Sequence, residues 1–162
     1  MHRSPLGGRQ AFTMMEIMIV VALIGLLAVL AIPAFMTSRR RAQDTAFIND
    51  LRILSAAFTQ YTMTSGDFPP NQGPGVLPPE IVDCMPTRYD FTAATPIGGY
   101  WDWDRAPQRG QQIYGCYAGL SVSLPSRTTA QMAEIDARID DGDLTTGIFR
   151  SRAGGYICIL EQ

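Results

Sequence analysis

Residues 10–35 read QAFTMMEIMIVVALIGLLAVLAIPAF, and this segment determines the architecture of the protein. From Ile17 to Met36 no side chain carries a charge or an amide, and Ile, Val, Leu and Ala predominate. At a helical rise of about 1.5 Å per residue these positions span roughly 30 Å, the thickness of a bilayer's hydrocarbon core. The pattern predicts a transmembrane helix. It also raises a question, because a carboxylate, Glu16, stands at its start.

The composition argues against most enzyme chemistry. The chain has 162 residues and a net charge of −2, all 13 of its basic residues are arginine, and its one histidine is His2. Beyond His2 there is neither an imidazole nor a lysine amine for a general base, a Schiff base or a histidine metal site. We therefore expect no catalytic site, no cofactor and no metal. The mild negative charge likewise gives no reason to expect nucleic-acid binding.

The helical pattern continues beyond the apolar span. Residues 37–65 carry one apolar stripe on an otherwise polar helix, at positions 47, 51, 54, 58 and 61. Helix stop signals follow at Ser65, Gly66 and Asp67, with two prolines just beyond. One helix is therefore predicted from about Thr13 to about Ser65, with residues 12–36 in lipid and 37–65 as an amphipathic continuation.

The remainder, 66–162, reads as one small domain. Residues 66–98 hold seven of the chain's 11 prolines and should form a long loop. Four β-like segments and one short helix follow; the strands are predicted at 99–104, 113–124, 146–152 and 154–160, and the helix at 128–139. The last two strands should form a hairpin. The expected fold class is α+β, with the long N-terminal helix packed on a small antiparallel sheet and one short extra helix.

Two acidic segments each allow both a functional and a structural interpretation. In YWDWD (100–104), Trp101 and Trp103 fall on one strand face and Asp102 and Asp104 on the other. A catalytic or sugar-binding carboxylate pair is conceivable, but glycosidase carboxylates face each other across a cleft, so a half-buried strand is the better interpretation.

The second pattern is the turn IDDGDLTTG, in which Asp140, Asp141 and Asp143 lie close together. Three carboxylates could hold calcium, but the spacing is not that of an EF-hand loop. An Asp-Gly turn between a helix and a strand explains the residues without metal, and we favour it.

Residues 11–35 resemble the N-terminal segment of type IV pilins and of type II secretion pseudopilins. The resemblance rests on a small residue, Ala11, followed by Phe12, by Glu16 as the fifth residue of the mature chain, and by Gly25 and Pro33 within the span. It implies that a prepilin peptidase cuts between Ala11 and Phe12 on the cytoplasmic side and N-methylates Phe12. Residues 1–11 would then be a cleaved basic leader. The family usually has glycine where this chain has Ala11, so we expect slower cutting.

The resemblance also assigns assembly roles to Phe12, Glu16, Gly25 and Pro33. In related filaments the carboxylate pairs with the freed amine of a neighbour's first residue, and the helix between the glycine and the proline is often unwound. For each residue there is also a structural explanation that does not involve assembly. Thr13 and Glu16 fit a capping box, glycine is common in membrane helices, and proline near a helix end is a terminator.

The three cysteines are Cys84, Cys116 and Cys158. In an oxidising compartment one disulfide and one free thiol is the simplest expectation, with three possible pairings. We expect Cys116–Cys158, since both lie in predicted strands and many pilins tie their C-terminal region this way. Some pseudopilins also bind calcium in their C-terminal loop.

The resulting expectation is a structural subunit of a pilus or a type II secretion pseudopilus, not an enzyme. Its partners would be like subunits, minor pseudopilins, the prepilin peptidase and an inner-membrane assembly platform. The chain would cross the bacterial inner membrane once, with a cytoplasmic N-terminus and an extracytoplasmic domain at 66–162. The alternative is a signal-anchored binding or enzymatic domain that forms no filament. A DNA-uptake filament also fits, although loss of Arg3 and Arg9 with the leader would make the net charge −4.

Overall fold

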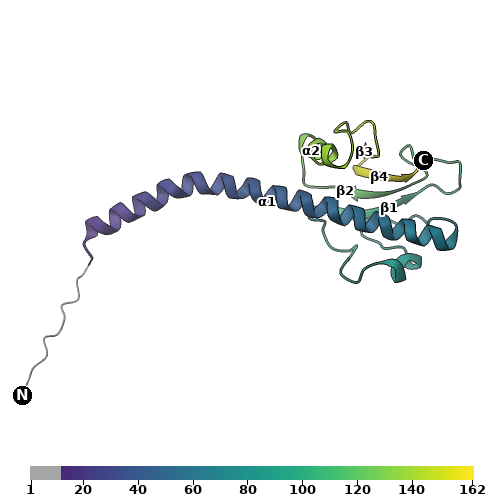
Figure 1. Cartoon of the computed structure of the whole chain (residues 1–162), viewed down its shortest axis with the longest axis horizontal. Helices are drawn as coiled ribbons and strands as arrows, with labels where there is room; N and C mark the ends of the chain where they lie inside the picture. The colour runs from purple at the N-terminus through teal and green to yellow at the C-terminus, as the bar shows by residue number, and fades with distance from the viewer. Residues whose placement is uncertain (1–11) are drawn as a thin grey trace, which may run out of the picture. The chain divides into compact units, whose positions relative to one another are not determined.

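A computed structural model describes residues 12–162. Helix α1 runs from Met14 to Ser65 (Figure 1), which confirms the single long helix predicted from the sequence. The chain divides into two compact units, one ending at Arg41 and one comprising residues 42–162. The first unit is the apolar part of α1, and the second contains the rest of α1 and the sheet.

The sheet has four antiparallel strands in the order β1-β2-β4-β3. The strands are β1 (Tyr100–Arg105), β2 (Ala118–Ser123), β3 (Phe149–Arg152) and β4 (Gly155–Glu161). β3 and β4 form the predicted hairpin, and helix α2 (Thr129–Ile139) joins β2 to β3. Thr128 and Gln131 cap α2 reciprocally, which satisfies two backbone amides at its start. The expected α+β fold is confirmed; the proline-rich loop adds a short 3₁₀ helix, η1 (Pro79–Cys84).

Aromatic stacking fastens the sheet to the second half of α1. The Phe58 ring stacks on Trp103 at 3.8 Å between centroids, and Phe47 stacks on Trp101 at 5.2 Å. All four side chains are buried. Because they come from the apolar stripe of α1 and from one face of β1, the two periodicities seen in the sequence meet in one core.

The second predicted strand is shorter than expected. Residues 113–117 do not extend β2; instead the amides of Ile113 and Cys116 each donate to the other's carbonyl, at 2.8 and 3.1 Å. The two residues between them, Tyr114 and Gly115, have φ values of 53° and 81°. Two positive φ angles in succession make a type I′ turn, so β2 begins only after it, at Ala118.

The expected Cys116–Cys158 disulfide is not formed, and all three cysteines among residues 12–162 are free thiols. Strand alternation explains this. Cys158 belongs to the main core, whereas Cys116 packs with Ile157 and Ile159 in a separate small cluster. Since successive residues of β4 point to opposite faces of the sheet, the two thiols lie on opposite faces as well.

Candidate assembly site

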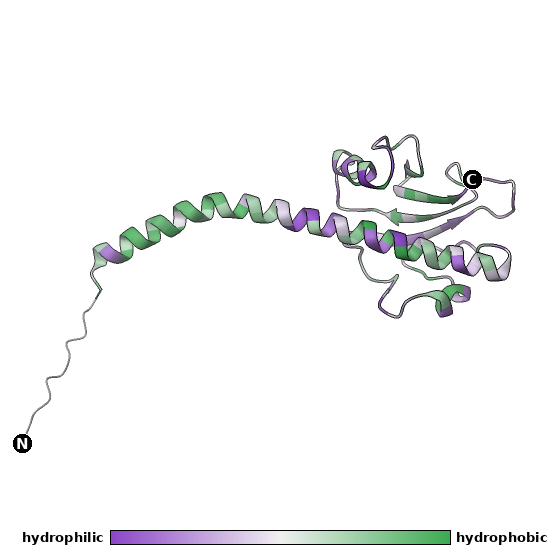
Figure 2. Cartoon of the chain, viewed as in Figure 1, coloured by the Kyte–Doolittle hydropathy of each residue, from purple (hydrophilic) through white to green (hydrophobic). Residues whose placement is uncertain are grey.

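Within residues 12–162, no other segment covers the apolar first part of α1. Large side chains along its whole length are exposed, for example Ile17 (52%), Leu23 (56%) and Leu30 (72%). Among residues 12–162, α1 is the one helix long and apolar enough to cross a membrane. In Figure 2 the ribbon of this segment is coloured as hydrophobic along most of its length. A soluble monomer rarely exposes so large an apolar area, so the segment needs lipid or other apolar helices around it.

Glu16 makes a capping box with Thr13. The Thr13 amide and hydroxyl both donate to Glu16 Oε2, at 2.9 and 3.0 Å, and the Glu16 amide donates to Thr13 Oγ1 at 3.2 Å. The box fixes the carboxylate at the first turn of α1, beside Phe12, which is 80% exposed. Because both Thr13 donors use Oε2, Oε1 is left to accept from a group outside this segment. Capping and intermolecular pairing are therefore compatible.

Gly25 and Pro33 lie inside the continuous helix α1. A Cβ atom built on Gly25 would meet nothing within 4 Å, so no contact among the described residues requires a glycine there. At Pro33 the helix lacks one amide donor, and Thr37 Oγ1 donates to the Pro33 carbonyl at 3.1 Å. The single chain is helical through both positions. Ala11 and the predicted leader lie outside the described residues.

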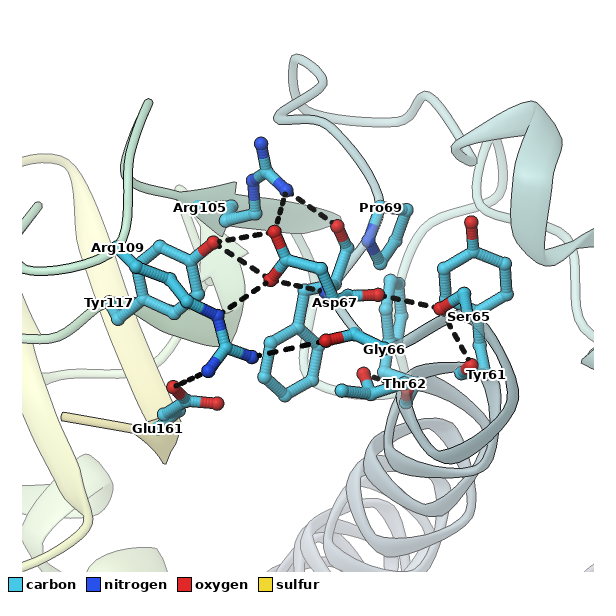
Figure 3. Close-up of polar contacts among 12 residues, drawn as sticks. Tyr61, Thr62, Ser65, Gly66, Asp67, Pro69, Arg105, Arg109, Tyr117 and Glu161 are labelled. Atoms are coloured by element: carbon cyan, nitrogen blue, oxygen red, sulfur yellow. Dashed lines mark hydrogen bonds and ion pairs between the residues drawn. The ribbon is translucent and has the colours of Figure 1, made fainter.

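Asp67 lies just after the C-terminal end of α1, and its carboxylate forms polar contacts with the sheet domain (Figure 3). It accepts from the Tyr117 hydroxyl at 2.8 Å and forms ion pairs with Arg105 at 3.2 Å and Arg109 at 3.5 Å. Burial works to raise the pKa of Asp67, but the Tyr117 hydroxyl, the Phe68 amide and the two guanidinium groups together lower it. This cluster ties the exit of α1 to β1 and to the residue before β2.

On the face of β1 opposite Trp101 and Trp103 lies a buried charged cluster that could not be predicted from the sequence. Arg152 pairs with Asp102 at 2.5 Å and with Asp104 at 3.3 Å, and the exposed fractions of the three side chains are only 5%, 5% and 7%. Ser121 and Ser123 donate to the two carboxylates. Burial raises the pKa of Asp104. The alternation of Trp and Asp in β1 is therefore confirmed, but β1 is buried on both faces.

This charged cluster is a structural feature, not a catalytic pair. The carboxylates converge on Arg152 and on two serines, and the Tyr114 ring lies over the guanidinium at 5.0 Å from Cζ. Both carboxylates are buried, whereas a glycosidase pair faces its substrate across a cleft.

Comparison with known proteins gives relatives that match part of the chain. The chain is 37% identical to the type IV major pilin protein PilE1 of Neisseria gonorrhoeae over 71 residues, 44% of this chain and 33% of that protein. It is 30% identical to the type II secretion system core protein G of Klebsiella pneumoniae over 92 residues, 57% of this chain and 63% of that protein. A fimbrial protein of Neisseria meningitidis is 36% identical over 63 residues, 37% of its length.

The matches thus span between about one third and just under two thirds of these relatives. No family model matches the chain, and no solved structure does.

Proposed function

We propose that the chain is a filament subunit of the type IV pilin and type II secretion pseudopilin kind, built into a helical assembly through residues 12–36. Its similarity to members of both groups supports this. The observation that carries this proposal is the uncovered apolar part of α1 with Glu16 fixed at its start. In the bilayer, lipid covers that surface. In a filament, the same segments of neighbouring subunits would cover it, and the domain at 42–162 would be displayed outside.

The proposal includes processing at the N-terminus. A prepilin peptidase cuts between Ala11 and Phe12 and methylates the new amine, and the chain then stays in the inner membrane with the domain on the far side. Cutting supplies the group that Glu16 lacks in the single chain, namely a cationic amine on Phe12. An assembly platform in the same membrane, together with minor pseudopilins, would add the processed subunit to the filament.

A carboxylate in this position needs a partner. Placing it within an apolar segment costs on the order of 2–3 kcal/mol in a membrane. A pair with the amine of a neighbouring subunit at about 4 Å contributes roughly 4 kcal/mol at an effective dielectric constant near 20, before desolvation is subtracted. The pair would therefore offset the cost of insertion. It would also set the axial register between subunits, because a subunit out of register leaves both charges unpaired.

Between a pilus and a secretion pseudopilus, the extent of similarity favours the pseudopilus. The match to the Klebsiella type II secretion protein extends over 57% of this chain, against 44% for the gonococcal pilin. We infer that the chain is of the pseudopilin kind. No substrate or catalytic step is assigned to it.

The rival function is a membrane-anchored domain that never polymerises, and the mature N-terminus separates the two. The full chain would be expressed with a prepilin peptidase, extracted from membranes, and its N-terminal peptide identified by mass spectrometry. The proposal predicts a peptide that begins with N-methylated Phe12. The Ala11→Arg variant, which places a large charged side chain at the cleavage site, should retain the leader. Wild-type protein that still begins at Met1 in the presence of active peptidase would overturn the proposal.

A further inference from the structure

Three consecutive arginines, Arg39, Arg40 and Arg41, follow the apolar span of α1, which ends at Met36. At a rise of about 1.5 Å per residue, their Cα atoms lie roughly 5–8 Å beyond Met36 along the helix. The headgroup region on each side of a bilayer's hydrocarbon core is of about the same thickness. When the apolar span crosses a membrane, the three arginines therefore stand at the depth of the lipid phosphates.

The nearest carboxylate along α1 already has a partner. The sequence holds no Asp or Glu between Glu16 and Asp44. Asp44 has the helical spacing to pair with Arg40 or Arg41, but it is buried and forms an ion pair with Arg127 at 3.0 Å. Its Oδ1 atom also accepts from Arg127 Nε at 3.0 Å. Since no other carboxylate of α1 follows within two turns, α1 itself gives the arginines little to balance their charge.

The direction of the side chains distinguishes a lipid partner from a second copy of the chain. Successive helical residues are about 100° apart, so Arg39 and Arg41 lie on nearly opposite sides of α1, and both are exposed. A headgroup layer surrounds the helix and reaches both sides. A second copy would bring three more arginines to the same level of α1, and its Asp44 would be paired with its own Arg127. Charge complementarity therefore favours lipid phosphates.

We propose that Arg39, Arg40 and Arg41 bind the phosphate groups of anionic phospholipids at the extracytoplasmic surface of the membrane, and so hold the subunit at a fixed depth before assembly. A guanidinium group binds two phosphate oxygens at once. It has five N–H donors, so an arginine that also contacts its own chain keeps donors for a lipid. In the proposed orientation the arginines lie on the side where membrane proteins usually carry fewer Lys and Arg residues, and the lipid contact compensates for that placement.

The test measures which lipids the full chain retains. Protein purified in a mild detergent would be mixed with equal amounts of phosphatidylglycerol and phosphatidylcholine of the same acyl chains, and bound lipids would be counted by native mass spectrometry. Without screening, each arginine at a membrane surface favours anionic lipid by about fivefold. We expect a preference for phosphatidylglycerol of about tenfold or more at about 0.1 M salt. It should fall at about 1 M salt, because the Debye length shortens from about 10 Å to about 3 Å.

Two variants make the test specific. Arg39→Gln/Arg41→Gln replaces the two exposed arginines, so the domain should unfold as in wild type when followed by tryptophan fluorescence. Its lipid preference should fall to about twofold, because one of the three charges remains. Arg52→Gln is the matched control. Arg52 is also an exposed arginine of α1, but it lies roughly 24 Å beyond Met36 along the helix, more than one Debye length past the headgroups. This variant should keep the wild-type preference.

Wild-type protein without a lipid preference, or Arg39→Gln/Arg41→Gln protein with the wild-type preference, would overturn the proposal. A preference that inorganic phosphate removes at constant ionic strength would assign the site to free phosphate and refute the lipid assignment. Loss of filaments in the double variant with an unchanged lipid preference would place the arginines at a contact between copies instead. The inference depends on the membrane segment and not on assembly, so its failure would leave the test of the mature N-terminus at Phe12 unaffected.

Discussion

Replacing Arg152 by methionine removes the only cation paired with Asp102 and Asp104 in the described structure, at a site where all three side chains are at least nine-tenths buried. Breaking a buried pair by deleting one partner typically costs about 3–5 kcal/mol, because the remaining charge stays buried. Two carboxylates remain here, and the serine hydroxyls that donate to them offset part of the cost. We therefore expect a loss of about 3–5 kcal/mol in the free energy of unfolding at neutral pH.

The loss should depend on pH. Burial already raises the pKa of Asp104, and loss of the neighbouring guanidinium will raise it further. A carboxyl group with a raised pKa in the folded state binds more protons there than in the unfolded state, so its unfavourable contribution grows as pH rises through the folded pKa. The Arg152→Met variant should accordingly be closer to wild type near pH 4.5 than near pH 7.5, since the carboxyl group is then neutral.

The assay is denaturant unfolding of the full chain in detergent, followed by fluorescence of Trp101 and Trp103, which are both in the core. Arg109→Met is the matched control, because its ion pairs with Asp67 and Glu161 are 56% exposed on the arginine side and should contribute less than about 1 kcal/mol. Equal losses in the two variants, or a defect in Arg152→Met that does not shrink in acid, would refute this reasoning.

Phe58→Ala removes the ring stacked on Trp103 and should destabilise the domain by about 3–5 kcal/mol, measured in the same unfolding assay; a loss below about 1 kcal/mol would contradict the core described above. Asp67→Asn should cost about 1 kcal/mol at neutral pH, and the difference from wild type should vanish as pH falls below about 4, because a lowered carboxyl pKa contributes stability that is lost in acid. Burial raises the pKa of Cys116 and of Cys158 to about 11, so alkylation of the native protein should modify half-buried Cys84 first and reach the other two only on unfolding. Peptide mapping without reductant should find all three thiols free, and a Cys116–Cys158 peptide would contradict the structure.

The long helix and the strands could be predicted because each depends on a local period in the sequence. The stripe that contains Phe47 and Phe58 has the helical spacing, and Trp101 and Trp103 alternate as a strand requires. These elements are set by neighbouring residues, so the sequence was sufficient for α1, for the hairpin of β3 and β4, and for α2.

What could not be predicted depends on contacts between distant residues. Asp102 reads as a solvent-facing strand residue until β3 brings Arg152 beside it. Asp136 reads as an ordinary polar position of α2, and only the return of the loop shows that it is buried beside Asp140. The disulfide prediction was wrong for the same reason, since strand assignment alone does not say which face of the sheet Cys116 occupies.

The assembly residues differ from these, because their predicted contacts lie between subunits and not within one chain. The structure places Glu16 in a capping box with Thr13, which the sequence allowed as one of its two roles. The intermolecular role of Glu16, and the roles of Gly25 and Pro33, concern contacts between subunits and stay predictions.

The most direct test of the central claim compares filament formation by two variants that separate charge from capping. Glu16→Gln keeps a side chain that can fill the capping box but removes the charge, whereas Thr13→Ala breaks the box and keeps the charge. Both proteins, coexpressed with the peptidase and the assembly machinery, would be checked for cleavage after Ala11, and filaments would be quantified by sedimentation and electron microscopy. We predict that processed Glu16→Gln protein stays membrane-bound and monomeric while Thr13→Ala forms filaments. Wild-type filament yield from processed Glu16→Gln protein would contradict the account.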